Sequence, residues 1–430
     1  MGGRLLLRGG RVVDPAAGLD GERDVLLADG RVAEVGARLA ARGAEVLDVA
    51  GQVVCPGFID LRAHLREPGH EEKETLATGL AAAAAGGFTA VCAFPDSEPC
   101  NDGAGVTRLV LERAAAAGPV RLHPVGALSR GRRGEELADL GELAECGCVA
   151  FSDAPRSLAS ARLLRRGLEY ARLFERPVVV QCEDASLAEG TVMNEGPVAG
   201  VLGLRGAPAE AEALQAERDL LLAGLSGGRL HLSQVSAAGA VEALRRARAR
   251  GLRVSADVSP HHLLLTDEAV RASGYDTATK LRPPLRSEAD RQAVLAALRD
   301  GTIAAIASGH SPENLDDKRC EFDAAAFGLS ALETAVAACL DRLVRPGLLE
   351  LGTLVARFSL GPARAFGLPG GSLEPGAPAD VTVLDLERKR SVDPARFLSL
   401  GRSTPFASWS LRGWPVLTIV GGQVAHRSQR

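Results

Sequence analysis

The sequence predicts an α/β protein in which a (β/α)8 barrel carries a small β-sandwich built from both ends of the chain. Two patterns in the 430 residues favour this fold. From residue 53 onward, short apolar strands alternate with helical segments, whereas both ends of the chain consist of short strands separated by turns. We therefore expect residues 1–54 and 367–430 to form the β-sandwich and residues 55–366 to form the barrel.

The two ends of the chain contain short apolar runs bounded by Gly and Asp, which are common turn residues. The candidate strands of the first segment lie at 5–7, 11–13, 25–27, 31–35 and 45–47. Near the other end, 380–384 and 416–424 follow a turn-rich link at 370–376. We expect this tail to complete the N-terminal module.

The central segment contains eight candidate strands separated by helices. The strands lie at 53–60, 89–93, 120–125, 148–151, 178–180, 230–232, 254–258 and 304–307. The clearest helical segments lie at 76–85, 158–175, 209–223 and 238–250. A parallel barrel of this kind places its functional side chains at the carboxyl ends of the strands.

Composition excludes several classes of function. The net charge of −4 gives no electrostatic reason to bind nucleic acid or a membrane surface, and 3% aromatic residues leave few platforms for stacking bases. The first residues lack a secretory apolar core, and no apolar run reaches the ~18 residues of a membrane helix. The eight cysteines lack paired spacing, as is usual for buried thiols in a reducing compartment. We expect a cytoplasmic protein.

The most informative motif is Arg62-Ala63-His64, which closes the first barrel strand. Residues two apart on a strand point the same way, so a His-x-His pair there would present two imidazoles to one metal ion. A guanidinium stays protonated and has no lone pair to donate. Half of a metal-binding pair has therefore been replaced by a cation.

This stretch, 60–69, resembles the dihydroorotase family of the amidohydrolase superfamily, whose strand reads roughly Asp-x-His-x-His-Leu-Arg-Glu-Pro-Gly. Only the first His differs here. Further segments resemble family motifs in the same order along the chain: Ala93-Phe94-Pro95-Asp96-Ser97, Phe151-Ser152-Asp153, Gln181-Cys182-Glu183-Asp184, 231–236, 259–263, 283–287 and 307–312. Because the matches are ordered and cover most of the chain, the resemblance is specific.

The resemblance implies a zinc site with six ligand or base positions. In this chain they are occupied by Arg62, His64, Asp153, Gln181, Gln234 and Gly309. Only His64 and Asp153 keep the family's residue type, and a catalytic zinc needs about three protein ligands. We therefore assign no catalytic residue and expect no cofactor, with zinc as the alternative. We also expect Arg62 to fill the vacated site and pair with Asp153.

The positions that hold substrate in the family are mixed. Arg66 matches the arginine that binds the substrate carboxylate. Asp96 and Arg282 each stand where the family has Asn, and Glu313 replaces a His that helps to hold substrate. Arg66, Arg282 and Asp96 are the candidate substrate-binding residues.

Three hypotheses follow. The first is a catalytically inactive, dihydroorotase-like protein of pyrimidine biosynthesis that acts as a structural subunit with aspartate carbamoyltransferase, a partner that the resemblance implies, in a homo- or hetero-oligomer. The second is an active dihydroorotase or related cyclic amidohydrolase with a rebuilt site that uses His64, Asp153, His310 and Glu313. The third is a binding module that takes an anion through Arg66 and Arg282.

Overall fold

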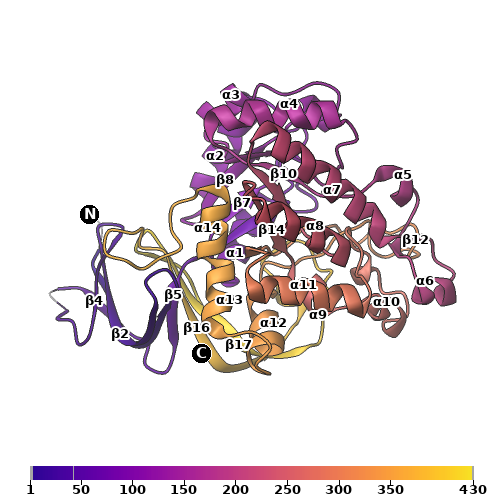
Figure 1. Ribbon diagram of the computed structural model, residues 1–430. Helices are drawn as coiled ribbons and strands as arrows, with labels where there is room; N and C mark the ends of the chain where they lie inside the picture. The colour runs from indigo at the N-terminus through magenta and orange to yellow at the C-terminus, as the bar shows by residue number, and fades with distance from the viewer. Residues whose placement is uncertain (1–2, 42, 429–430) are drawn as a thin grey trace.

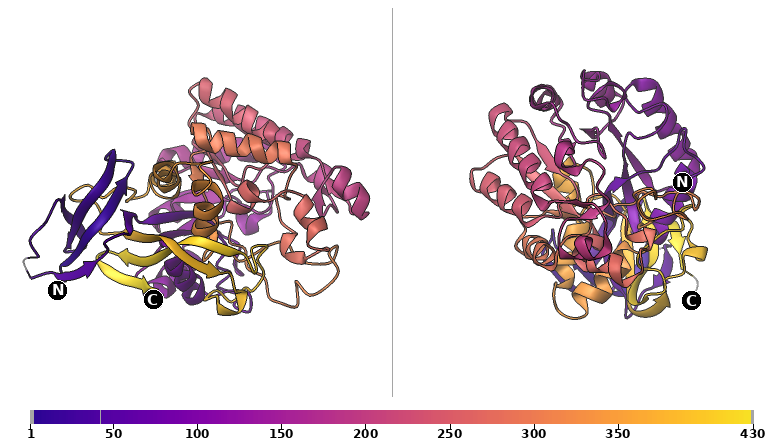
Figure 2. Two further views of the ribbon diagram at one scale, coloured as in Figure 1. Left: turned by 90° about the horizontal axis from the view of Figure 1, so that it is seen from below. Right: turned by 90° about the vertical axis from the view of Figure 1, so that its right-hand side faces the viewer.

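The computed structural model describes residues 3–41 and 43–428 and confirms the predicted architecture. A parallel barrel wrapped by helices forms the larger body, and a β-sheet module that contains strands from both ends of the chain lies beside it (Figure 1). The views in Figure 2 show the strands from the start and the end of the chain side by side in this module.

Eight parallel strands form the barrel, as predicted. In sheet order from one end to the other they are β6 (Phe58–Ala63), β7 (Phe88–Ala93), β8 (Arg121–Gly126), β9 (Ala150–Ser152), β10 (Val178–Val180), β13 (Leu230–Leu232), β14 (Val254–Val258) and β15 (Ala305–Ile306). The ends of this sheet meet through a parallel bridge between Ala63 and His310, which closes the barrel. Their sequences are mostly apolar and most of their residues are buried, which suits strands that are covered on both faces.

The first predicted strand, 53–60, is two strands. β5 (Val53–Pro56) pairs with the terminal sheet, and β6 begins the barrel at Phe58. Gly57 lies between the two strands. Only glycine fits at this position, because a Cβ there would lie 2.3 Å from Thr89 Oγ1. The switch between the two sheets therefore falls close to the predicted boundary at 54/55, and the exact domain limits stay a prediction.

The terminal sheet has eight strands. They are β1 (Leu5–Asp14), β2 (Leu19–Ala28), β3 (Arg31–Gly36), β4 (Glu45–Asp48), β5, β16 (Val381–Ser391), β17 (Ser410–Val420) and β18 (Gln423–Arg427). Their order is β18-β17-β16-β5-β1-β2-β3, with β4 also paired to β1. β16 runs antiparallel to β5, so the two ends of the chain share one sheet and one apolar core.

Helices connect the barrel strands and cover them. They are α1 (Leu76–Ala85), α2 (Ala104–Ala117), α3 (Leu140–Glu145), α4 (Ala161–Ala171), α5 (Ala185–Ala188), α6 (Pro197–Leu202), α7 (Ala209–Ser226), α8 (Ala238–Ala249), α9 (Pro260–Leu264), α10 (Glu268–Ala272), α11 (Glu288–Asp300), α12 (Ala335–Cys339), α13 (Leu351–Phe358) and α14 (Leu360–Phe366). Thr75 begins α1 with a reciprocal capping box to Thr78. A short parallel pair, β11 (Met193–Asn194) with β12 (Gly206–Ala207), lies beyond α5.

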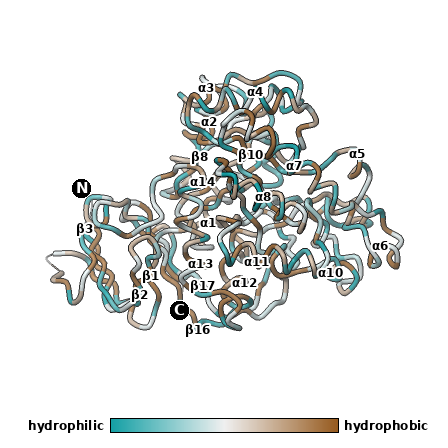
Figure 3. The backbone as a smooth tube through the Cα atoms, viewed as in Figure 1, coloured by the Kyte–Doolittle hydropathy of each residue, from teal (hydrophilic) through white to brown (hydrophobic). Residues whose placement is uncertain are grey.

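Within the described part of the chain, no helix is both long enough and apolar enough to cross a membrane. Figure 3 shows hydrophobic and hydrophilic segments interspersed along the outer helices. This alternation is typical of helices that bury one face against a barrel.

Candidate functional site

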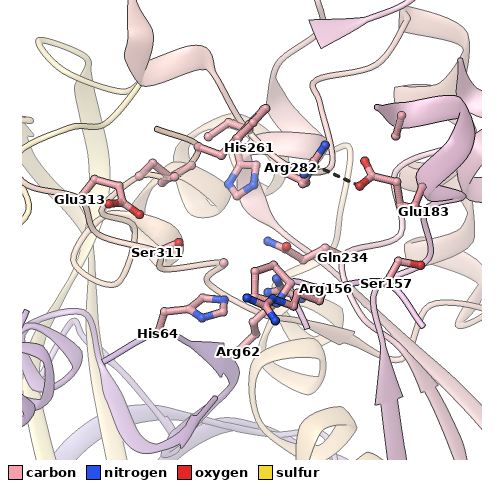
Figure 4. Close-up of a pocket in the computed structure, with 18 of the residues that line it drawn as sticks. Arg62, His64, Arg156, Ser157, Glu183, Gln234, His261, Arg282, Ser311 and Glu313 are labelled. Atoms are coloured by element: carbon pink, nitrogen blue, oxygen red, sulfur yellow. Dashed lines mark ion pairs between the residues drawn. The ribbon is translucent and has the colours of Figure 1, made fainter. Parts of the chain in front are cut away.

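A cavity of about 830 Å³ opens at the carboxyl ends of the barrel strands. Arg62 lies at the end of β6, and Gln234 and Gly309 follow β13 and β15. Figure 4 shows Arg62 and Gln234 with His261, Arg282, Glu183, Ser311 and Glu313 around the opening. The topology therefore brings together most of the residues that the sequence singled out.

Arg62 is a buried cation at the floor of this cavity. Its Nη2 donates to Gln181 Oε1 at 2.5 Å, its Nη1 donates to Ser233 Oγ at 3.2 Å, and its guanidinium lies 5.1 Å from the centre of the Phe94 ring. Burial lowers the pKa of Arg62 to about 10, although nearby carboxylates oppose this shift. The side chain thus remains charged at neutral pH and fills the position of the first family ligand.

The expected pairing of Arg62 with Asp153 is wrong. Asp153 accepts hydrogen bonds from the backbone N–H groups of Leu128 and Ser129, at 3.0 and 2.9 Å, and from the hydroxyl of Ser129. Burial raises the pKa of Asp153, and these hydrogen bonds oppose the shift. The loop after β8 therefore satisfies this carboxylate, and Asp153 does not supply the counter-charge for Arg62.

A polar network beneath Arg62 was not predicted from sequence. Ser233 Oγ, which accepts from Arg62, donates to Asp257 Oδ2 at 3.0 Å. Asp257 also lies 2.9 Å from His231 Nε2 and accepts from the backbone N–H of Gln234 at 2.8 Å. An acidic residue inside the apolar strand at 254–258 was the available signal, because a buried carboxylate needs partners.

Gln234 and Gly309 fit each other. Gly309 has φ of +69°, and a Cβ at this position would lie 2.5 Å from Gln234 Nε2 and 2.8 Å from His261 Cε1. The family's acidic side chain would have to stand in space that Gln234 and His261 occupy here. The two replacements are therefore structurally linked, since the side chain at 234 excludes a larger residue at 309.

His64 is buried with Asp96 and points its Nδ1 at the Asp96 carboxylate, 2.8 Å from Oδ2. Burial lowers the pKa of His64 to about 4, against the pull of Asp96. Burial opposes ionisation of Asp96, but His64 and Arg66 hold the pKa of this carboxyl well below its usual range. His64 is therefore neutral at pH 7 and in contact with a carboxylate.

Arg66 is held by protein carboxylates. Its Nη1 donates to Asp96 Oδ2 at 2.7 Å and its Nη2 donates to Glu313 Oε1 at 2.6 Å. Nη2 also reaches Ser311 Oγ at 2.9 Å, and Nε reaches the carbonyl of Pro312 at 3.2 Å. Four of the five guanidinium hydrogens are thus used inside the protein. Asp96 and Glu313, which stand where the family has Asn and His, provide both carboxylates.

Arg282 lies at the mouth of the cavity. Its Nε is 3.1 Å from Glu183 Oε2, and its guanidinium lies 4.8 Å from the centre of the Phe327 ring. The side chain of Arg282 is 32% exposed and meets solvent, whereas that of Arg66 is only 12% exposed. The contact between Arg282 and Glu183 could not be predicted from sequence, because it is set by two distant loops.

Two histidines that the motifs contain have different surroundings. His261 lines the cavity, and its Nδ1 is buried without a hydrogen-bond partner among the described residues. His310 points away from the cavity: its Nε2 lies 3.2 Å from Glu74 Oε2, and its Nδ1 accepts from the backbone N–H of Ala331 at 3.2 Å. His310 is therefore a structural residue in this fold.

The residues at the six family positions do not fit a zinc ion. Within residues 3–41 and 43–428, no three His, Cys, Asp or Glu side chains form a group that could hold a metal. Arg62 is a cation, Gln181 is bound to it, and Asp153 is turned to the Ser129 loop. His64 keeps its family position but faces Asp96.

Comparisons with known proteins agree with the motifs. A family model described as dihydro-orotase-like matches residues 51–239, and that of the amidohydrolase family matches residues 205–425. A protein named dihydroorotase from Anaeromyxobacter dehalogenans strain 2CP-1 is 54% identical over 427 residues, which cover 99% of this chain and 98% of that protein. Another dihydroorotase, from Pelotomaculum thermopropionicum, is 49% identical over 421 residues, 98% of both chains.

Solved structures agree with the fold. An L-hydantoinase from Arthrobacter aurescens superimposes with a TM-score of 0.89 at 24% identity, covering 100% of this chain and 97% of that one. A dihydropyrimidinase from Brevibacillus agri gives a TM-score of 0.83 at 24% identity, covering 99% and 95%. At this identity the likeness concerns the fold alone.

These matches contradict the expectation that no cofactor is involved. The matched relatives are named dihydroorotases, and the dihydroorotase family is the one for which the motifs implied a zinc site. The expectation followed from counting ligands in one sequence. The family relationship favours a metal-dependent protein instead.

The fold, the ordered motifs and the matched relatives lead to one conclusion about ancestry. Identity of 54% over nearly the full length of both chains is far more than a shared barrel requires. The chain belongs to the dihydroorotase family of the amidohydrolase superfamily.

Proposed function

We propose that this chain is a dihydroorotase-family protein of pyrimidine biosynthesis that does not hydrolyse dihydroorotate and instead acts in assembly with aspartate carbamoyltransferase in the cytoplasm. The observation that carries the first part is Arg62. A guanidinium bound to Gln181 and Ser233 stands where the family places a metal ligand. Hydrolysis of a cyclic amide in this family uses a metal-activated water, and a fixed cation disfavours a metal at the same point.

The state of Arg66 supports the same conclusion. The family arginine that binds the substrate carboxylate must have free donors, but Arg66 is bridged by Asp96 and Glu313. A substrate carboxylate would have to displace one of these buried carboxylates, which would then lose its partner. The substitutions at 96 and 313 thus act on substrate binding, as those at 62, 234 and 309 act on the metal site.

Support for an assembly role comes from α7. Leu214, Leu221 and Leu225 are 57%, 54% and 63% exposed. Their spacing of seven and four residues places them along one face of the helix. α7 packs its other side against α4 and α8, so this apolar face is directed outward. Exposed apolar stripes of this kind mark protein interfaces.

A co-elution experiment tests the assembly role. The full-length chain and aspartate carbamoyltransferase, mixed at micromolar concentration, should co-elute from a size-exclusion column. Leu221→Glu should abolish co-elution, whereas Leu173→Glu, which changes a leucine outside α7 that is even more exposed, should not. Independent elution of the two wild-type proteins would remove this part of the proposal.

The second candidate is an active dihydroorotase with a rebuilt site, and the comparisons support it better than the first. Proteins named dihydroorotase are 54% and 49% identical to this chain over almost its whole length. A rebuilt site would use His64, Asp153 and Glu313. His310 would not take part, because its side chain is bound to Glu74. Turnover of dihydroorotate by the purified chain in zinc-containing buffer separates the two candidates.

A further inference from the structure

A second cavity lies at the opposite end of the barrel from the site described above. Its volume is about 380 Å³. Arg229 and Arg253, which line it, directly precede β13 and β14, and Pro177 directly precedes β10. Because the first site follows the carboxyl ends of the strands, a cavity at their amino ends must lie on the other face of the barrel.

Five arginines line this cavity. Arg229 and Arg253 come from the strand starts, whereas Arg248, Arg357 and Arg364 lie in the last turns of α8, α13 and α14. The helices run back against the strands, so their carboxyl ends meet the strand starts at this face. No Asp or Glu is among the lining residues.

Four of these five charges have no carboxylate partner among the described residues. Only Arg253 forms an ion pair, with Glu175. Arg229, Arg248 and Arg357 donate to backbone carbonyls, such as Ala365 O at 2.7 Å from Arg229 Nη2. These bonds explain why arginines stand at helix ends, but a carbonyl does not neutralise a guanidinium.

Arg364 is the most informative of the set. Its side chain is exposed and forms no hydrogen bond or ion pair with the described residues, so capping does not account for it. The nearby carboxylate of Asp300 is paired with Arg245 at 2.8 Å. Burial lowers the pKa of Arg229 and Arg357, and neighbouring guanidinium groups add to this shift, whereas the carboxylates of Glu175 and Asp300 oppose it.

We propose that this cavity binds a phosphate-bearing small molecule through its diphosphate group. The planar fork of arginine suits phosphate oxygens, and a concentration of unneutralised charge favours a multiply charged anion over a carboxylate. The rest of the lining is mainly apolar, with Leu230, Leu252, Val254 and Leu360 together with the small residues Gly301, Ala304, Ala356 and Gly361. No aromatic side chain lines it, so the cavity offers no stacking surface for a base.

Calorimetric titration of the full-length protein tests this proposal. Sodium pyrophosphate, orthophosphate, ADP and UDP are titrated separately in about 50 mM salt, because screening weakens such contacts at higher ionic strength. We expect saturable binding of pyrophosphate and weaker binding of orthophosphate. If the nucleoside diphosphates bind more tightly than pyrophosphate, a nucleotide is the source of the group, and equal affinity points to free diphosphate.

The variant Arg364→Glu should weaken binding by about tenfold or more, because one attraction becomes a repulsion. Since this side chain makes no hydrogen bond or ion pair with the described residues, the unliganded thermal midpoint should not fall. The matched control is Arg108→Glu, at another exposed arginine without an ion pair among the described residues, on α2. Absence of binding to the wild-type chain, or equal weakening by both variants, would overturn the proposal. Neither result depends on whether the chain hydrolyses dihydroorotate.

Discussion

The contact between Gln234 and Gly309 gives a quantitative prediction for Gly309→Ala. Gly309 has φ of +69°, and its added Cβ would meet the Gln234 amide at 2.5 Å and the His261 ring at 2.8 Å. A left-handed backbone costs an L-residue about 1–2 kcal/mol. Overpacking costs about 1–3 kcal/mol more. The amide is the end of a flexible chain, but the His261 ring is fixed against His262, with 4.6 Å between ring centres.

Gly274→Ala is the control for the backbone term alone. Gly274 has φ of +66°, and a Cβ there would meet no atom within 4 Å. Urea unfolding should therefore show a larger loss of stability for Gly309→Ala than for Gly274→Ala, by roughly 1–3 kcal/mol. Adding Gln234→Ala should recover part of the difference. Equal losses at the two glycines, or full additivity with Gln234→Ala, would refute the idea that residue 234 excludes a side chain at 309.

Three further predictions concern the charges around the cavity. Burial raises the pKa of Asp60 to about 7, so the folded chain keeps a proton that the unfolded chain loses. Stability should therefore fall as the pH rises from 4 to 7, by on the order of 4 kcal/mol for this group, and Asp60→Asn should flatten that slope in denaturant titrations across the range. Glu313→Gln frees part of Arg66 and should tighten dihydroorotate binding by about tenfold in calorimetry, whereas Glu183→Gln should not. Arg62→His alone should give no turnover in a spectrophotometric assay, since Gln181, Gln234 and Gly309 would remain.

Much of the fold followed from sequence pattern because each barrel strand is a short apolar run with its own turn signals. The exception is 53–60, where one continuous run contains two strands in different sheets. The separation at Gly57 depends on the approach of Thr89, which lies over 30 residues away. Periodicity within a segment cannot show a contact of that kind.

The candidate site was predicted in outline and not in its contacts. Motif positions identified Arg62, Gln234 and Gly309, because a strand's end fixes where its residues point. The partner of Arg62 was predicted wrongly, since Asp153 is turned by a hydrogen-bonding loop at 128–129. Likewise, nothing local to Arg66 shows that Glu313, 247 residues later, will bind its guanidinium. Such pairings depend on loop geometry.

Turnover of dihydroorotate by the purified chain distinguishes an inactive from an active member of the dihydroorotase family. The purified full-length chain is assayed in zinc-containing buffer, beside Asp153→Ala and a blank without protein. We expect the wild-type chain and the variant both to match the blank, because Arg62 and the carboxylates on Arg66 occupy the family's metal and substrate positions. Turnover above the blank that Asp153→Ala abolishes would instead establish an active dihydroorotase with a rebuilt site.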